Sequence, residues 1–234
     1  VLSATTVVLN SERSAVTVDV QNPVNRVYGS LEVAKVVTGP GAKSVPADRT
    51  FAGNAVCTYG DDAPVTKTWE ATTAKPGVVT GVLVGSTCTV TETAPKSGPS
   101  ATDPSLIWLS AKLPADVTVK AAPDVVTATV ENPTGQLFGT FGITKTVTGA
   151  RAGVAADASY TFNWKCTPAG LGSPLTGTAR VADGGLWQLP SVISVPRGST
   201  CSITEESESR PVLADAAYSW APVKLSVDGA KGTQ

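Results

Sequence analysis

Alternation of apolar and polar residues is the main regularity of this chain, and it occurs in short segments. In residues 31–37 alternate positions hold Leu, Val, Lys and Val, and in residues 141–147 they hold Phe, Ile, Lys and Val. Alternate side chains of a β-strand point to the same face, so each segment predicts a half-buried strand. Lys35 and Lys145 then point inward with the apolar residues. A buried ammonium group is costly unless it is paired or neutralised, which makes both lysines candidate functional residues.

Similar alternating segments recur along the chain, separated by clusters of Gly, Pro, Asp and Ser. The sequence is rich in Val and Thr, which favour strands, and it contains 22 Gly and 17 Pro, which favour turns. We find no convincing segment of useful length with the period of an amphipathic helix. The pattern predicts an all-β protein.

An internal repeat divides the chain. Residues 1–35 align with residues 111–145 without a gap, at a shift of about 110 residues that suits a domain rather than a solenoid unit. The octapeptide GSTCTVTE at 85–92 likewise aligns with GSTCSITE at 198–205. The small changes in this shift along the chain place insertions in loops between strands.

The alignment predicts three parts. Residues 1–24 match the last strand of a preceding repeat, or a donor strand. Residues 25–136 form one complete β-sandwich repeat, and residues 137–234 form a second repeat that lacks its last strand. The segment 16–22 has the sequence expected of that missing strand.

The composition narrows the function classes. Hydrophobic residues make up 41% and charged residues 16% of the 234 positions, which suits a globular protein. The net charge of −1 predicts no strong attraction to nucleic acid or to an anionic membrane, and no apolar run is long enough to span a bilayer. Histidine is absent, which removes the commonest general base and neutral metal ligand, and we expect no cofactor or metal. Methionine is also absent, so we expect a processed chain or a fragment.

Each repeat contains two cysteines at equivalent positions on the predicted inward face of a strand. They are Cys57 and Cys88 in the first repeat, and Cys166 and Cys201 in the second. One disulfide per repeat is the favoured interpretation, and it implies an oxidising, extracellular setting. Four free buried thiols are the alternative. A zinc site is not expected, because two cysteines per repeat without histidine give too few ligands.

Three polar side chains of the complete repeat share the inward face of their strands. Glu92 and Asn132 have the parity of their apolar neighbours, as Lys35 does, and Glu205 and Asn22 occupy equivalent positions. A lysine, a carboxyl group and a carboxamide are the ingredients of an intramolecular isopeptide bond. Burial favours neutral groups, so a neutral lysine amine can attack the asparagine carbonyl while the carboxylic acid passes protons to departing ammonia. This would be self-modification in a single turnover rather than enzymatic turnover.

Two alternatives remain open for Lys35 at this level. In the first, Lys35 and Glu92 form a buried ion pair that is hydrogen-bonded to Asn132, although such pairs are weak evidence for stability. In the second, Lys35 lies near a strand end and its ammonium group extends along the surface to water. The decision between them depends on geometry.

Lys35, the segment CTVTETAP at 88–95 and the segment VENP at 130–133 resemble the B-type repeats of Gram-positive collagen adhesins and pilins (CnaB-like repeats). The variant with cysteines is similar to uncharacterised repeats of actinobacterial surface proteins. The resemblance implies tandem immunoglobulin-like sandwiches, often crosslinked between a first-strand Lys and a last-strand Asn with Glu as catalyst. By position it implies Lys35, Glu92 and Asn132, then Lys145 and Glu205.

Two departures from the resemblance matter. The collagen-adhesin pattern usually lacks the cysteine pair, which can take over the stabilising role. The second copy reads EES at 205–207 where the first reads ETA at 92–94, and it contains no asparagine equivalent to Asn132.

These observations together predict a structural segment of a stalk or fibre on a secreted bacterial surface protein, extracellular and attached to the cell surface or cell wall. Its expected partners are neighbouring repeats or other copies of the chain. Residues 16–22 of one copy can supply the missing strand of another, so that Asn22 reacts with Lys145 between chains. The alternative is an adhesin module that binds host glycan or protein through its loops. We expect no turnover enzyme, because no nucleophile–base–acid set lies outside the Lys, Glu and Asn group.

Overall fold

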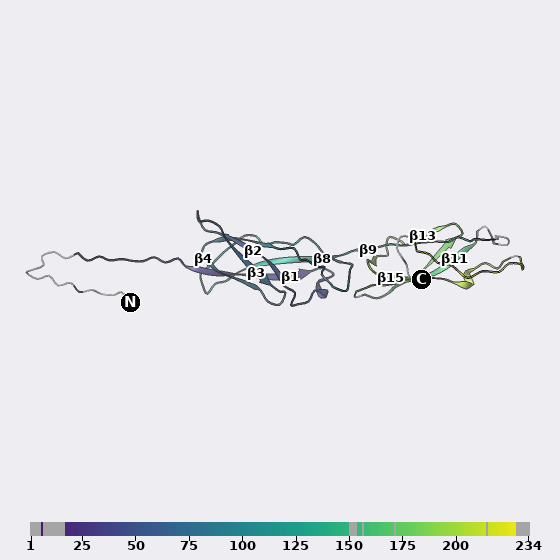
Figure 1. Ribbon diagram of the computed structural model, residues 1–234, viewed down its shortest axis with the longest axis horizontal. Helices are drawn as coiled ribbons and strands as arrows, with labels where there is room; N and C mark the ends of the chain where they lie inside the picture. Colours follow the sequence, from purple (N-terminus) through teal and green to yellow (C-terminus); the bar gives the residue numbers. More distant parts are fainter. Residues whose placement is uncertain are drawn as a thin grey trace, which may run out of the picture.

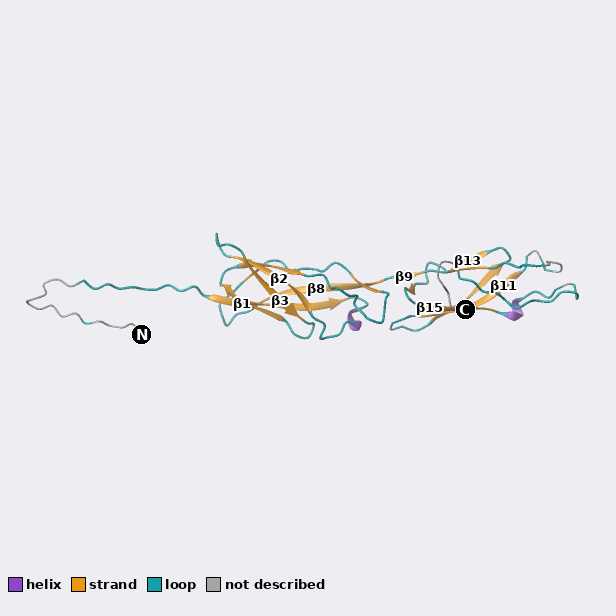
Figure 2. Cartoon of the chain, in the orientation of Figure 1, coloured by secondary structure: helices purple, strands orange, loops and turns teal. Residues whose placement is uncertain are grey.

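The computed structural model describes residues 6, 17–149, 154–155, 157–170, 172–213 and 215–227 of the chain. The all-β prediction is confirmed: the described residues form fifteen strands and two short 3-10 turns, η1 (Ala42–Ser44) and η2 (Ser207–Ser209). Figure 2 shows the strands gathered in two bodies that lie end to end. We call strands β1 to β8 the first repeat and strands β9 to β15 the second repeat.

The first repeat is a sandwich of two four-stranded sheets. One sheet has the order β4-β1-β8-β6 and contains β1 (Tyr28–Thr38), β4 (Gly77–Leu83), β6 (Leu106–Trp108) and β8 (Val126–Gln136). The other has the order β3-β2-β5-β7 and contains β2 (Phe51–Thr58), β3 (Val65–Ala71), β5 (Thr87–Glu92) and β7 (Val117–Thr118). The first and last long strands, β1 and β8, are parallel neighbours, whereas β1 and β4 are antiparallel.

Strict alternation builds the core of this sandwich. Along β2 every second residue from Phe51 to Cys57 is buried, and the intervening residues are half-buried or exposed. Leu31 and Val33 of β1 are fully buried, and they pack in one cluster with Val90 of β5 from the opposite sheet. The period-2 pattern of the sequence thus becomes one apolar layer between the two sheets.

The second repeat has its own core and a smaller set of strands. They are β9 (Phe138–Gly139), β10 (Gly142–Thr144), β11 (Ser159–Thr167), β12 (Leu175–Ala182), β13 (Leu186–Gln188), β14 (Val195–Pro196) and β15 (Thr200–Glu205). They pair as β12-β11-β15, β10-β13 and β14-β9. Buried residues of β11 and β12 form most of the second apolar cluster, which is separate from the first.

The second repeat reproduces the first without its last three strands. Strands β9 and β10 take the place of β1, and they pair with β14 and β13 as β1 pairs with β4. No described strand takes the place of β6, β7 or β8, so the edge of β10 that corresponds to the β8 side of β1 has no strand partner among the described residues. The strand expected at 141–147 is accordingly shorter, because only its β13 edge is paired.

The segment expected to be an unattached strand, 16–22, is described from residue 17 onward. Residues 17–27 belong to no sheet, and they run outward from the first repeat on the side away from the second (Figure 1). Val18 is 52% exposed and Val20 is 73% exposed. No sheet edge among the described residues lies beside this segment to pair with its backbone groups, so its role as a last strand or donor strand stays a prediction.

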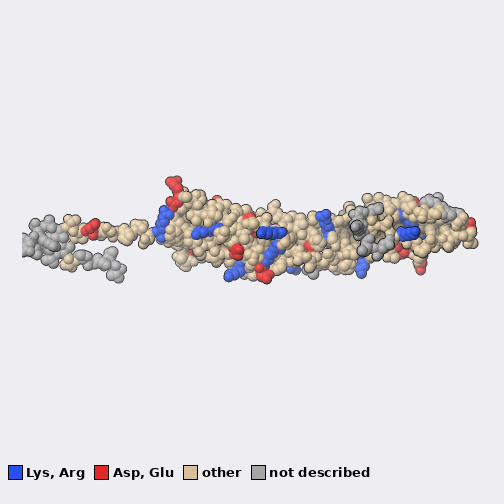
Figure 3. All heavy atoms as spheres, viewed as in Figure 1, with Lys and Arg blue, Asp and Glu red and all other residues tan. Residues whose placement is uncertain are grey.

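Charged side chains are dispersed over the surface. On the face drawn in Figure 3, the positive and negative groups are interspersed among a larger area of other residues. No helix among the described residues is long and apolar enough to cross a membrane.

Candidate crosslinking site

Lys35, Glu92 and Asn132 meet inside the first repeat. Lys35 comes from β1, Glu92 from the end of β5 in the opposite sheet, and Asn132 from β8. The Lys35 Nζ atom lies 3.0 Å from Glu92 Oε1, and the two side chains are 0% and 2% exposed. The Lys35 ammonium therefore does not reach water, and the interpretation in which it extends to the surface is wrong.

Asn132 completes the cluster. It is 2% exposed, and its Nδ2 atom donates a hydrogen bond to the same Glu92 Oε1 atom at 3.1 Å. The lysine nitrogen and the amide nitrogen thus share one carboxylate oxygen. The parallel register pairs Lys35 with Val130 and Val37 with Asn132, so Lys35 and Asn132 are diagonal neighbours on one face of the sheet. Lys35 Nζ also donates to the Val130 carbonyl at 3.4 Å.

One acceptor of this cluster is unused. The Asn132 Oδ1 atom is buried and accepts no hydrogen bond from any described residue. A buried carbonyl oxygen without a donor is a costly arrangement in a folded protein. A donor that forms during a reaction, such as a protonated Glu92, would remove this cost.

The surroundings of Lys35 favour its neutral form. Burial lowers the pKa of Lys35 below its usual range, although the hydrogen bond and the negative charge of Glu92 act in the opposite direction. The Phe51 ring lies 4.7 Å from Nζ and closes the cluster on a further side. An amine that loses its proton readily is a competent nucleophile.

The geometry is that of the ion-pair interpretation, and it is also that of the reactants for an amide bond. The amine, the carboxyl group and the carboxamide lie in one dry cluster, with the carboxyl group in contact with both nitrogens. No described residue outside the cluster donates to the amide oxygen. The arrangement can therefore stay a buried ion pair or proceed to a covalent bond by proton transfer through Glu92.

The second repeat holds a related pair that is less enclosed. Lys145 Nζ lies 3.2 and 3.1 Å from the two Glu205 oxygens, and the side chains are 13% and 3% exposed. Arg210 also approaches Glu205 Oε1 at 3.3 Å, and the Tyr160 ring lies 4.4 Å from Lys145 Nζ. No described asparagine joins this pair, and Asn22 is exposed in the segment that runs away from the second repeat.

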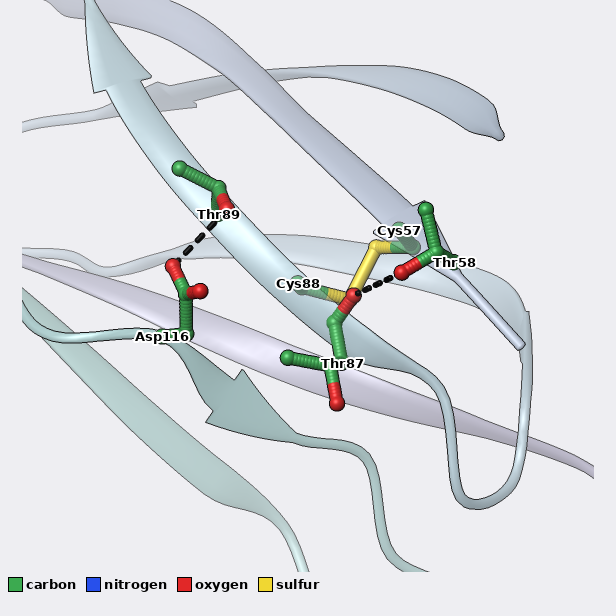
Figure 4. The surroundings of a disulfide bond; sticks show 6 residues. All are labelled: Cys57, Thr58, Thr87, Cys88, Thr89 and Asp116. Carbon is green, nitrogen blue, oxygen red and sulfur yellow. Dashed lines mark hydrogen bonds between the residues drawn. A yellow bond between two sulfur atoms is a disulfide. The ribbon is translucent and has the colours of Figure 1, made fainter. Parts of the chain in front are cut away.

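Both disulfides expected from the sequence are present. Cys57 and Cys88 are directly opposite on β2 and β5, and Cys166 and Cys201 are directly opposite on β11 and β15. Each disulfide joins neighbouring strands of one sheet. In Figure 4, Asp116 lies beside the first disulfide and accepts a hydrogen bond from the Thr89 hydroxyl at 2.7 Å.

Cys201 is less covered than the other three cysteines. Cys88 is 0% exposed because Val117 of β7 pairs with it on the outer side of β5. Cys201 is exposed, since no described strand covers β15 at the equivalent place. Parity predicted the direction of the Cys201 side chain, but it does not predict which element covers that side chain.

Two participants were missed in the sequence. Phe51 has the parity of Cys57, so its inward direction was predictable, but its contact with Lys35 comes from the other sheet. Arg210 follows the last described strand and carries no periodic signal. Among the described residues no group of three or more acidic or cysteine side chains is arranged to hold a metal ion, and Asp62 of the Asp61–Asp62 turn pairs with Arg26 at 2.9 Å.

The chain therefore consists of two related β-sandwich repeats, each with a cross-strand disulfide and an inward lysine–glutamate pair. It belongs to the protein family described as "Domain of unknown function (DUF5979)", which matches residues 31–133 and 141–234. No curated protein matches the sequence.

Two solved structures are similar to parts of the chain. The Bacillus anthracis TIE protein has 14% identity and a TM-score of 0.39, and the match covers 76% of this chain and 28% of that one. The major pilin from Streptococcus pyogenes has 11% identity and a TM-score of 0.25, with 79% and 83% of the two chains covered. The chain thus spans 28% of the TIE protein's length.

Proposed function

We propose that this chain is a structural segment of an extracellular bacterial stalk or fibre, in which Lys35 and Asn132 of the first repeat become joined by an isopeptide bond. The observation that carries this proposal is the dry cluster in which one Glu92 oxygen contacts both Lys35 Nζ and Asn132 Nδ2. The two disulfides support an oxidising location outside the cytoplasm. The sequence resemblance to crosslinked surface repeats points the same way.

The reaction balances without any added reagent. Glu92 accepts a proton from the Lys35 ammonium, and the neutral amine attacks Asn132 Cγ, forming the Nζ–Cγ bond. Glu92, now a carboxylic acid, hydrogen-bonds Oδ1 and relays the proton that Nζ releases to Nδ2. The Cγ–Nδ2 bond breaks and neutral ammonia leaves, while Glu92 keeps the proton that it took from the Lys35 ammonium. A neutral amide and a neutral carboxylic acid then replace a buried ion pair.

The position of the bond suits a load-bearing role. The parallel strands β1 and β8 are the points at which the chain enters and leaves the first repeat, so tension between the two ends shears these neighbours along their length. A bond between Lys35 and Asn132 would carry that tension directly from strand to strand. The chain between these residues, including both sheets' remaining strands, would be protected from extension.

The second repeat is proposed to accept a strand from another copy. Its β10 edge has no β8 counterpart among the described residues, and its Lys145–Glu205 pair has no asparagine there. Residues 17–22 are exposed and have the sequence type of β8, with Asn22 at the position of Asn132. Strand addition at an open edge would bring Asn22 to Lys145 and link copies covalently.

The test is intact mass spectrometry of the full chain under reducing and non-reducing conditions, followed by peptide mapping. We expect a deficit of one ammonia for the first repeat, located in a crosslinked peptide containing Lys35 and Asn132. Asn132→Ala should restore the full mass, whereas Asn163→Ala, an exposed asparagine on β11, should leave the deficit unchanged. A wild-type mass explained by the disulfides alone would refute the isopeptide bond.

Pulling the same chain by its ends tests the load-bearing role. In the wild-type protein the chain between Lys35 and Asn132 should not extend, because the bond between these residues carries the force. Asn132→Ala should extend by about 200 Å, the length of the chain released between Lys35 and Asn132 after subtracting the loop held by the Cys57–Cys88 disulfide. Equal extension of the two proteins would contradict the role.

A further inference from the structure

The contact between the two repeats is built on a small turn, residues 103–105. Asp103 Oδ1 accepts hydrogen bonds from the Ser105 backbone N–H at 3.0 Å and from its hydroxyl at 2.6 Å. Asp103 is 7% exposed and Ser105 is fully buried. The Ser105 carbonyl accepts from the Leu137 N–H at 2.8 Å, where the chain passes from β8 to β9. We call residues 103–105 the docking turn of the first repeat.

The docking turn lies directly against glycines of the second repeat. A Cβ atom added to Gly198 would lie 2.5 Å from Pro104 Cγ, and one added to Gly170 would collide with the Asp103 carboxylate. Gly198 also has a φ of +82°, which favours glycine. Leu137, whose carbonyl accepts a hydrogen bond from the Arg197 N–H at 2.9 Å, is half-buried at the same place. These three residues, Leu137, Gly170 and Gly198, mark the pole of the second repeat.

The first repeat has an equivalent pole. No docking turn among the described residues lies against it, whereas residues 103–105 lie against the pole of the second repeat. The Val84 N–H donates to the Val27 carbonyl at 2.9 Å, repeating the bond between Arg197 and Leu137. Gly85, at the position of Gly198, has a φ of +87° and only the Tyr59 ring of its own repeat near its Cβ direction. Asp61 stands at the position of Gly170, and a Cβ added to its neighbour Gly60 would meet nothing within 4 Å. Val27, at the position of Leu137, is 59% exposed.

The second repeat carries a second copy of the docking turn at residues 215–217. The Ala217 N–H donates to Asp215 Oδ1 at 2.9 Å, as Ser105 does to Asp103. The tryptophan that follows each turn has the same support, since Trp220 Nε1 donates to the Pro211 carbonyl at 3.0 Å and Trp108 Nε1 to that of Ser97 at 2.9 Å. Asp215, Ala216 and Ala217 are all exposed, whereas Asp103 and Ser105 are buried.

We propose that the docking turn of one copy, residues 215–217, binds the first-repeat pole of a second copy, marked by Val27, Gly60 and Gly85. The contact would reproduce between copies the joint that the chain already forms between its own repeats.

The side chains of the two surfaces match in size. Pro104 is replaced by the smaller Ala216 in the turn, and Pro168 is replaced by the larger Tyr59 at the pole, whose ring lies over Gly85. The two changes compensate each other.

The pole also carries charged groups. Gln136, which donates to the Ser105 hydroxyl at 3.1 Å, corresponds to Arg26, whose side chain is 63% exposed at the free pole and pairs with Asp62 at 2.9 Å. The Asp215 carboxylate would therefore have to share Arg26 with Asp62. Docking would also carry residues 17–22 toward the open edge of β10, but the turn and the pole need neither strand addition nor the isopeptide bond to meet.

Sedimentation velocity of the full chain over a wide concentration range provides the first test. We expect reversible, concentration-dependent head-to-tail association that Ala216→Arg weakens about tenfold, ~1.4 kcal/mol. Val192→Arg adds the same charge to an 89% exposed position of the same repeat and should leave association unchanged. Asn22→Ala should remove any covalent product between copies without removing the reversible association. A chain that stays monomeric, or one that associates equally well with Ala216→Arg, would overturn the proposal, and the second result would leave strand addition standing.

Paramagnetic relaxation locates the contact. A copy with a spin label at Ala216→Cys, mixed with an isotopically labelled wild-type copy, should broaden the amide signals of Val27, Gly60 and Gly85. A label at Val192→Cys should broaden none of these three. Three results would show that the pole is not the partner of the turn. They are no broadening, broadening spread evenly over the chain, and equal broadening from the two labels.

Discussion

Asn132→Ala separates a covalent tie from a buried ion pair by the size of its effect on stability. In both cases the variant loses one hydrogen bond to Glu92, which is worth about 1 kcal/mol. Only in the covalent case does it also release a constraint on the unfolded chain. The substitution leaves Lys35 and Glu92 paired, so it does not abandon a buried charge.

The extra loss can be worked from the topology. A link from Lys35 to Asn132 closes a loop of roughly 100 residues, for which the chain-entropy relation gives about 4.7 kcal/mol. The Cys57–Cys88 disulfide, with a sequence separation of 31, already closes part of that loop. Because the dependence on loop length is logarithmic, the remaining stabilisation is still about 4 kcal/mol. For a domain of this size the melting temperature should fall by roughly 15 to 30 °C.

Differential scanning calorimetry of the full chain measures this, because the two repeats have separate cores and the second serves as an internal reference. The transition of the first repeat should move and that of the second should stay. Asn54→Ala, an exposed asparagine of β2 outside the cluster, should move neither transition appreciably. The covalent tie would be refuted by two results together. The wild-type chain would have its full mass, and the melting temperature of Asn132→Ala would fall by no more than the loss of one hydrogen bond explains.

Three further outcomes are expected. In Asn132→Ala the amine of Lys35 still titrates with a pKa lowered by burial, so the unfolded chain binds more protons between that pKa and the usual 10.5. The free energy of unfolding of Asn132→Ala, measured with denaturant, should therefore rise with pH across this window. The double variant Asn132→Ala/Lys35→Met should show no such rise. The Cys166–Cys201 disulfide should be reduced before that of the first repeat in a mild phosphine titration followed by alkylation mapping, because Cys201 is exposed. Gly53→Ala should cost about 2 kcal/mol or more in thermal unfolding, because its Cβ would meet a backbone oxygen and an indole ring closer than packing allows.

Most of the first repeat could be predicted from the sequence because its central strands, β1, β8, β2 and β5, are paired on both sides. Alternation predicted the inward direction of Lys35 and Asn132, and the structure places both among the most buried polar residues. The equivalence of the cysteines predicted which residues pair. The central strands of this repeat have the neighbours that the alternation assumes.

The features that could not be predicted from the sequence are those in which one strand or turn covers a side chain of another. Parity placed Cys201 inward, but its exposure depends on a covering strand that no described residue supplies. Phe51 closes the space around Lys35 from the opposite sheet, and nothing local to either residue signals that contact. The docking turn became visible only when the buried Asp103 and the exposed Asp215 could be compared in one fold.

The parallel pairing of β1 with β8 also governs the order in which a repeat can fold as the chain emerges. The hydrogen bond between Lys35 and Val130 joins residues separated by 95 positions, whereas the disulfide partners of the same repeat are separated by 31. Contacts distant in sequence form late, because closing a long loop costs entropy before any contact is gained. If the chain emerges outside the cytoplasm with its amino end first, the β2–β5 pair can be complete and oxidised while β1 still has an open edge. The last strand to appear is thus the one that closes the sandwich and, with it, assembles the site.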